Sequence, residues 1–131
     1  MIHGGESNMS RFEAFEVALE LITALKPLIA KIALHDRDLA DQLKRAGSSA
    51  PLNINEGSRR IGRDRGHSYR IAAGSAAEVR AGLAVDQAWG YINVQDYQRP
   101  YKLADRLLAM LWRLNNPNNK PLDPSASTNL S

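Results

Sequence analysis

Apolar residues recur every three to four positions over most of this chain, which is the spacing of amphipathic α-helices. The first predicted helix runs from Arg11 to Leu34. One seam of this helix combines two apolar rows at heptad spacing, namely Phe15, Ile22 and Ile29 with Ala18, Leu25 and Ile32. A further apolar row lies on another face, formed by Val17, Leu21, Ala24 and Leu28. This is more apolar surface than one side of a small bundle requires, so the pattern predicts a second interface.

Capping residues and glycines divide the following segment into two more helices. Asp36 or Asp38 can cap a helix that reaches about Arg60. Asp64 is a candidate cap for a third helix, over residues 65–89, which ends at a glycine.

The fourth helix opens at Asn93, with Asp96 three residues later in a capping-box arrangement. Three prolines fall inside predicted helices, at Pro27, Pro51 and Pro100. Because the apolar rhythm resumes after each proline, we expect kinks rather than helix ends.

The chain divides into three parts on this pattern. Residues 1–10 are expected to be a flexible N-terminus, residues 11–114 a helical bundle, and residues 115–131, which contain three prolines and few apolar side chains, a disordered tail. No strand pattern occurs. Four helices joined by short loops predict an all-α, up-and-down four-helix bundle with kinked helices.

Length and composition fit one domain in a reducing compartment. The 131 residues are enough for a single core, and cysteine is absent. The N-terminus lacks the pattern of a signal peptide, and no apolar stretch approaches the roughly 18 to 20 residues that span a bilayer. We therefore expect a soluble, cytoplasmic protein with no membrane partner.

Basic residues are concentrated between Lys44 and Arg70. This stretch holds seven basic residues against two acidic ones, whereas the net charge of the whole chain is +3. Arginines at a helix C-terminus commonly do no more than complement the helix dipole. The alternative is contact with the phosphate backbone of RNA or DNA. The candidate nucleic-acid-binding residues are Lys44, Arg45, Arg59, Arg60, Arg63 and Arg65.

Patterns typical of enzymes, cofactors and metals do not occur. Gly57 and Gly62 have the separation of a phosphate-binding loop, but Arg63 and Asp64 replace its lysine and hydroxyl residue, and no strand precedes it. The three histidines have no ligand spacing, and no serine belongs to a recognisable catalytic triad. We expect no enzymatic activity, no cofactor and no metal.

Two glutamates fall on helical faces that are otherwise small or apolar. Glu56 and Glu78 would each need a partner if buried. Arg70 is the nearest candidate, so we predict a structural clamp of Glu56, Arg70 and Glu78. A catalytic carboxylate pair is the alternative, and it would be accompanied by a small-molecule ligand.

Two segments, APLNINEGSRR and SYRIAAGSAAEVRAGLAVDQAWGYI, resemble a family of four-helix bundles encoded in intervening sequences of bacterial large-subunit ribosomal RNA genes. The accessory variability protein of diversity-generating retroelements is a relative of that family. The matching positions are Pro51, Asn53, Ile54, Glu56, Gly57, Arg60, Arg70, Ala72, Gly74, Ser75, Glu78, Gly90 and Tyr91.

The resemblance implies a left-handed bundle assembled as a homopentameric ring, without enzymatic activity. For the retroelement branch it implies a basic surface that binds nucleic acid and a reverse transcriptase. The sequence thus predicts a non-enzymatic oligomer that binds a nucleic-acid backbone non-specifically. The alternative is a protein-interaction scaffold, for example a reverse-transcriptase accessory subunit, with no direct contact to nucleic acid.

Overall fold

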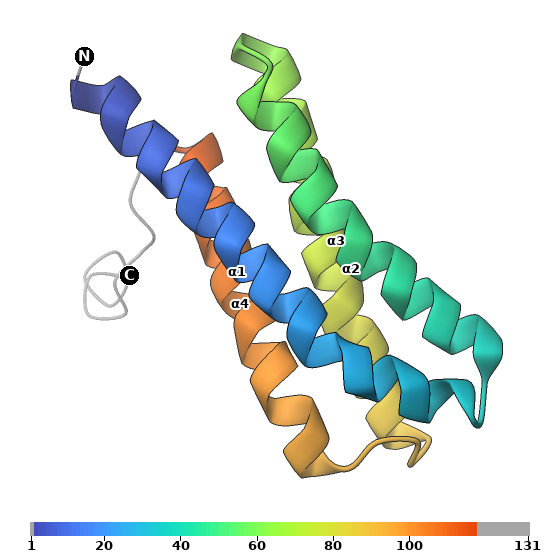
Figure 1. The fold of residues 1–131 in the computed structure, drawn as a ribbon. Helices are drawn as coiled ribbons and strands as arrows, with labels where there is room; N and C mark the ends of the chain where they lie inside the picture. The colour runs from blue at the N-terminus through green and yellow to red at the C-terminus, as the bar shows by residue number, and fades with distance from the viewer. Residues whose placement is uncertain (1, 118–131) are drawn as a thin grey trace, which may run out of the picture.

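Four helices follow one another in the computed structural model, which describes the backbone of residues 2–117 and the side chains of residues 9–117. They are α1 (Ile2–Ala33), α2 (Arg37–Ser58), α3 (Gly62–Ala88) and α4 (Val94–Asn115), and no strand occurs in residues 2–117. Helices α2 and α4 each pack against both α1 and α3. Figure 1 shows the helices running alternately up and down. The prediction of an all-α, four-helix protein is confirmed.

The starts of two helices follow the capping signals in the sequence. The Asp36 side chain accepts a hydrogen bond from the backbone N–H of Leu39 at 3.0 Å and so caps α2. At the start of α4, Asn93 Oδ1 accepts from the N–H of Asp96 at 2.8 Å, and Asp96 Oδ2 accepts from the N–H of Asn93 at 3.3 Å. This reciprocal pair is the predicted capping box.

The other two helices begin earlier than predicted. Helix α1 starts at Ile2 instead of Arg11, because backbone hydrogen bonding continues through a segment that has no apolar row to reveal it. Helix α3 starts at Gly62, preceded by Ile61 in an extended conformation without a side-chain cap. Asp64 is therefore not the cap. It lies in the first turn of α3, where its charge favours the helix N-terminus.

The predicted prolines all lie inside helices. Pro27 is in α1, Pro51 in α2 and Pro100 in α4, and each helix continues beyond its proline. The kinks, and the handedness of the bundle, stay predictions.

The core of α1 differs from the predicted arrangement of its rows. The row expected to form a second interface, which includes Val17, Leu21 and Leu28, is buried in the core. Of the predicted seam, the row of Ala18, Leu25 and Ile32 is buried as expected, whereas Phe15 and Ile22 are only half-buried. All these rows have helical spacing, so periodicity alone could not decide which of them face the neighbouring helices α2 and α4.

Helices α2 and α3 approach closely because small residues line their contact. Gly57 is buried against the ring of Tyr69, and a Cβ atom at Gly57 would lie only 2.7 Å from Tyr69 Cδ1. Farther along, Ser49 Oγ and Ser75 Oγ lie 2.7 Å apart, and Asn53 Nδ2 donates to the carbonyl oxygen of Ser49 at 2.9 Å. These contacts place the two sequence segments that carry the family resemblance against each other.

The predicted C-terminal tail falls almost wholly on residues 118–131, outside the described residues. None of the helices in the described part of the chain is long and apolar enough to cross a membrane.

Candidate nucleic-acid interface

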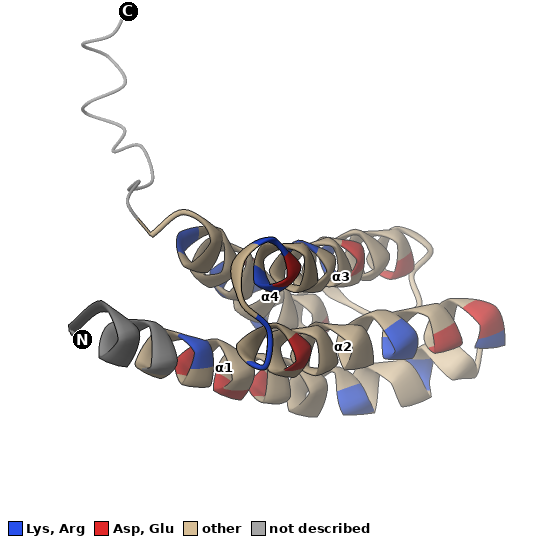
Figure 2. Cartoon of the chain, turned by 90° about the horizontal axis from the view of Figure 1, so that it is seen from above, with Lys and Arg blue, Asp and Glu red and all other residues tan. Residues whose placement is uncertain are grey.

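The turn between α2 and α3 carries four of the six predicted nucleic-acid-binding residues. Helix α2 ends at Ser58 and α3 begins at Gly62, so the connection is short. Gly62 has a φ of +59°, in the left-handed region that glycine adopts without steric cost. Figure 2 shows that Lys and Arg segments alternate with Asp and Glu segments over the molecule.

Arg65 stabilises this turn. Its Nε donates hydrogen bonds to the carbonyl oxygens of Arg60 at 2.8 Å and Gly57 at 3.2 Å. The last carbonyl groups of a helix lack intrahelical hydrogen-bond donors and form the negative end of the helix dipole. A guanidinium placed there donates to these carbonyl groups and interacts favourably with the dipole. This is the structural role that the sequence left open for arginines near the end of a helix, and here it falls to Arg65.

Arg60 is also engaged. Its Nη2 lies 2.7 Å from Glu56 Oε1 in an ion pair one helical turn long, and the hydrogen bond to Glu56 raises the pKa of the Arg60 guanidinium. Arg59 and Arg63 are exposed and take part in no ion pair within residues 9–117. Of the turn's four cations, these two remain free for a phosphate backbone.

Lys44 and Arg45 lie apart from the turn. Both are exposed on α2, and Lys44 precedes Arg59 by roughly 20 Å along the helix at 1.5 Å per residue. The six predicted residues therefore do not form one patch. Counting charged residues along the sequence cannot detect this separation, because residues about 15 positions apart in a helix lie far apart along its axis.

The predicted clamp does not form. Glu56 pairs with Arg60, while Arg70 and Glu78 are exposed and make no ion pair within the described residues. The contact between α2 and α3 is filled by Tyr69 and by small residues, so no glutamate is buried there. The buried carboxylate of this interface is Asp86, at 1% exposure.

A row of basic residues on α4 was missed by the sequence-based prediction. Arg99, Lys102 and Arg106 are exposed and line a shallow groove together with Gln95 and Gln98. Exposed Arg113 continues the row one heptad later. The signal was the three-and-four spacing of these cations, which places them on one face of a helix.

The acidic residues of α4 do not neutralise this row, which we call the α4 basic row. Asp96 pairs with Lys31 of α1 at 2.9 Å, and this contact lowers the pKa of the Asp96 carboxyl. Asp105 pairs with Arg80 of α3. The only acidic contact of the row within residues 9–117 is Arg99 with Glu20, at 3.8 Å between two exposed side chains, which is a weak pair. The α4 basic row is therefore a helix face with four exposed cations and one weak acidic contact within residues 9–117.

A family model described as "23S rRNA-intervening sequence protein" matches residues 10–113. The chain belongs to this family. Its fold agrees with a solved structure from Bacteroides thetaiotaomicron, a protein of unknown function from the S23 ribosomal protein family. The two chains are 20% identical, the match covers 78% of this chain and 97% of the other, and the TM-score is 0.73. No curated protein matches the chain significantly.

Some of the motif residues are packing positions. Gly57 admits the Tyr69 ring, and Ser75 Oγ meets Ser49 Oγ, which also accepts from Asn53 Nδ2, at the contact between α2 and α3. The cations of the α4 basic row lie outside the two sequence segments that carry the family resemblance.

Proposed function

We propose that this protein is a non-enzymatic, cytoplasmic oligomer that holds the backbone of nucleic acid without reading its sequence. The observation that carries the proposal is the α4 basic row, with Arg59 and Arg63 as a second group of free cations. From Arg99 to Arg113 the row spans roughly 20 Å of helix. One strand of a duplex presents a phosphate about every 3.4 Å of axis, so this length faces about six phosphates.

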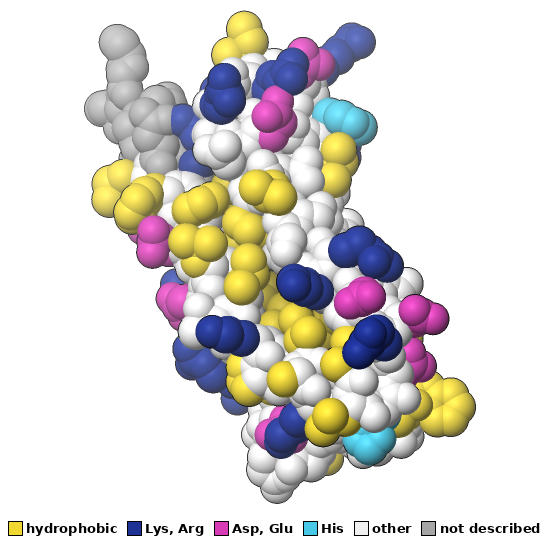
Figure 3. Space-filling model, turned by 45° about the vertical axis from the view of Figure 1, so that its right-hand side comes forward, with side chains coloured by type: hydrophobic (Ala, Val, Ile, Leu, Met, Phe, Trp, Pro, Cys, Tyr) yellow, Lys and Arg dark blue, Asp and Glu magenta, His cyan; other side chains and the backbone are white. Residues whose placement is uncertain are grey.

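Self-association is the second part of the proposal. Phe12 and Leu52 are 65% and 66% exposed, and Leu19 is 40% exposed. Figure 3 shows hydrophobic side chains in a band along one face, with Lys and Arg on both sides of it. Phe12 and Phe15 of α1 line a groove with Ile54 of α2. Burying such a surface favours association.

A pentamer is the assembly that the resemblance implies. Helix α4 packs mainly against α1 and α3, so an interface formed by α1 and α2 leaves the α4 basic row open to solvent. Each copy then adds one row, and several weak backbone contacts on one oligomer act at high effective concentration.

Binding of mixed-sequence duplex DNA and RNA, measured against salt concentration, tests the role of the row. A triple variant with glutamine in place of Arg99, Lys102 and Arg106 loses three positive charges. The magnitude of its slope of log affinity against log salt concentration should fall by about three. The matched control removes three exposed cations elsewhere, at Lys26, Arg37 and Arg70.

The control should retain most of the binding of the wild-type protein. An equal loss in the two triple variants would show that net charge, and not the α4 basic row, governs binding. Absence of any wild-type binding at about 50 mM salt, where phosphate contacts are strong, would remove the nucleic-acid proposal altogether.

The exposed apolar band favours a second candidate function. It is the kind of surface that docks another protein, so a scaffold or reverse-transcriptase accessory subunit is the function we propose if nucleic acid does not bind. Leu52→Glu distinguishes the uses of the band. If the band forms the interface between copies, sedimentation should show that the Leu52→Glu variant has the mass of a monomer. If its mass equals that of the wild-type oligomer, the band is not this interface and is available to a different partner.

A further inference from the structure

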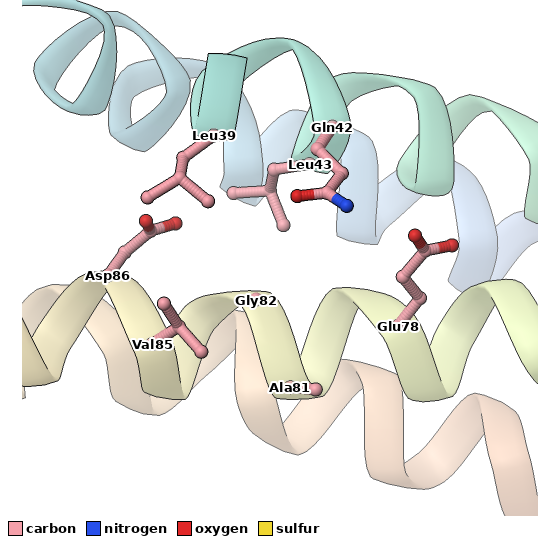
Figure 4. A pocket seen from close by; sticks show the side chains of 8 residues that line it. All are labelled: Leu39, Gln42, Leu43, Glu78, Ala81, Gly82, Val85 and Asp86. Atoms are coloured by element: carbon pink, nitrogen blue, oxygen red, sulfur yellow. The ribbon is translucent and has the colours of Figure 1, made fainter. Parts of the chain in front are cut away.

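A pocket of about 200 Å³ lies between α2 and α3, near the end of the bundle remote from the arginine-rich turn. Figure 4 shows Leu39, Gln42 and Leu43 reaching into it from α2, opposite the carboxylates of Glu78 and Asp86 on α3. Its walls are largely apolar, and its charged groups are both acidic.

Asp86 is buried in this pocket without a partner. Its side chain is 1% exposed, and Oδ1 makes no hydrogen bond within the described residues. A buried carboxylate oxygen normally has a donor, because its desolvation is otherwise uncompensated. Asp86 Oδ1 therefore lacks the donor that a buried carboxylate oxygen normally has.

Glu78 provides a second charge on the same face of α3. It precedes Asp86 by eight residues, which is roughly 12 Å along a helix. Gly82 lies midway between them, and Leu43 packs so closely onto it that a Cβ atom at this position would come 3.3 Å from Leu43 Cδ1. The pocket thus has an acidic group at each end and an apolar middle.

A metal ion does not match these groups. Calcium takes six to eight oxygen ligands, and no cluster of three or more His, Cys, Asp or Glu side chains occurs in the described part of the chain. The Asp86 carboxylate is instead beside Leu39 and Val85, which suit methylene groups. The groups present fit an elongated organic cation.

We propose that this pocket binds a linear aliphatic polyamine. One terminal ammonium group donates to Asp86 Oδ1, the other pairs with Glu78, and the methylene chain runs beside Leu43, along Ala81 and Val85. Spermidine, with about 11 Å between its terminal nitrogens from standard bond lengths, is close in length to the roughly 12 Å of helix axis between positions 78 and 86. Its central ammonium passes beneath Gln42, whose side-chain carbonyl is an acceptor.

Isothermal titration of the full-length protein, freed of nucleic acid, with spermidine at pH 7.5 tests the proposal. We expect saturable binding of one spermidine per chain. Asp86→Asn should weaken it by about 10-fold to 100-fold, the range expected for a lost charge-assisted hydrogen bond. The shorter 1,4-diaminobutane, which reaches only one carboxylate, should bind similarly weakly.

Glu78→Gln provides a variant whose folding is not in question, because Glu78 is exposed. It should weaken spermidine binding while leaving that of 1,4-diaminobutane nearly unchanged. The matched control is Asp41→Asn, which removes one exposed carboxylate from α2 outside the pocket. The proposal is overturned if wild-type protein does not bind spermidine, if Asp86→Asn binds it as tightly, or if Asp41→Asn loses as much affinity as Glu78→Gln.

Discussion

Replacing Asp86 with asparagine should stabilise the protein at neutral pH and should have much less effect in acid. Burial, aided by the negative charge of Asp36, raises the pKa of the Asp86 carboxyl from 3.8 to about 6. The folded state therefore disfavours the charged form, whereas the unfolded state does not. Asparagine has nearly the same shape and carries no charge.

The sign and size of the effect follow from proton linkage. Below about pH 4 the carboxyl is neutral in both states, so its charge costs nothing. As the pH rises to about 6 the unfolded chain ionises first, and the wild-type protein loses stability. At about 1.4 kcal/mol per pKa unit the full difference corresponds to about 3 kcal/mol. The pocket is open on one side to water, which reduces this to about 1 to 2 kcal/mol.

Urea unfolding of wild type and Asp86→Asn at pH 4 and pH 7.5 measures the effect. The stability of the variant relative to wild type should increase by about 1 to 2 kcal/mol between the two pH values. Any fixed cost of a buried amide is the same at both pH values and cancels in this comparison. If the difference in unfolding free energy between variant and wild type does not change with pH, burial does not raise the pKa of the Asp86 carboxyl.

Three further substitutions test the fold by urea unfolding. Gly57→Ala should cost about 1 to 3 kcal/mol, because the added Cβ atom overlaps the Tyr69 ring, and an unchanged midpoint would show that the two helices separate easily. Asn93→Ala should cost about 1 kcal/mol through loss of the capping box with Asp96, and a neutral result would indicate that water replaces the cap. Glu78→Ala should change stability by less than about 0.5 kcal/mol because this side chain is exposed, whereas a larger loss would support a buried clamp after all.

The sequence by itself determined the number and kind of the secondary-structure elements. Helical periodicity and local caps act over one or two turns, so neighbouring residues alone gave the pair of Asn93 and Asp96 as a cap and narrowed the cap of α2 to Asp36 or Asp38. The family resemblance was also readable, because its motif includes small residues, among them Gly57 and Ser75, that lie at the contact between α2 and α3. These features depend on neighbours close in the chain or on a recognisable pattern.

The tertiary structure decided which helix faces are buried and which charges remain free. The burial of Val17 and Leu21 rather than Phe15 depends on where α2 and α4 lie against α1. Arg60 and Arg65 are occupied by partners one or two turns away, so the basic turn retains fewer free cations than its sequence indicated. Two further features arise only when the helices pack together. Asp86 is buried without a hydrogen-bond partner for Oδ1, and Asp96 and Asp105 pair with other helices, which leaves the α4 basic row open.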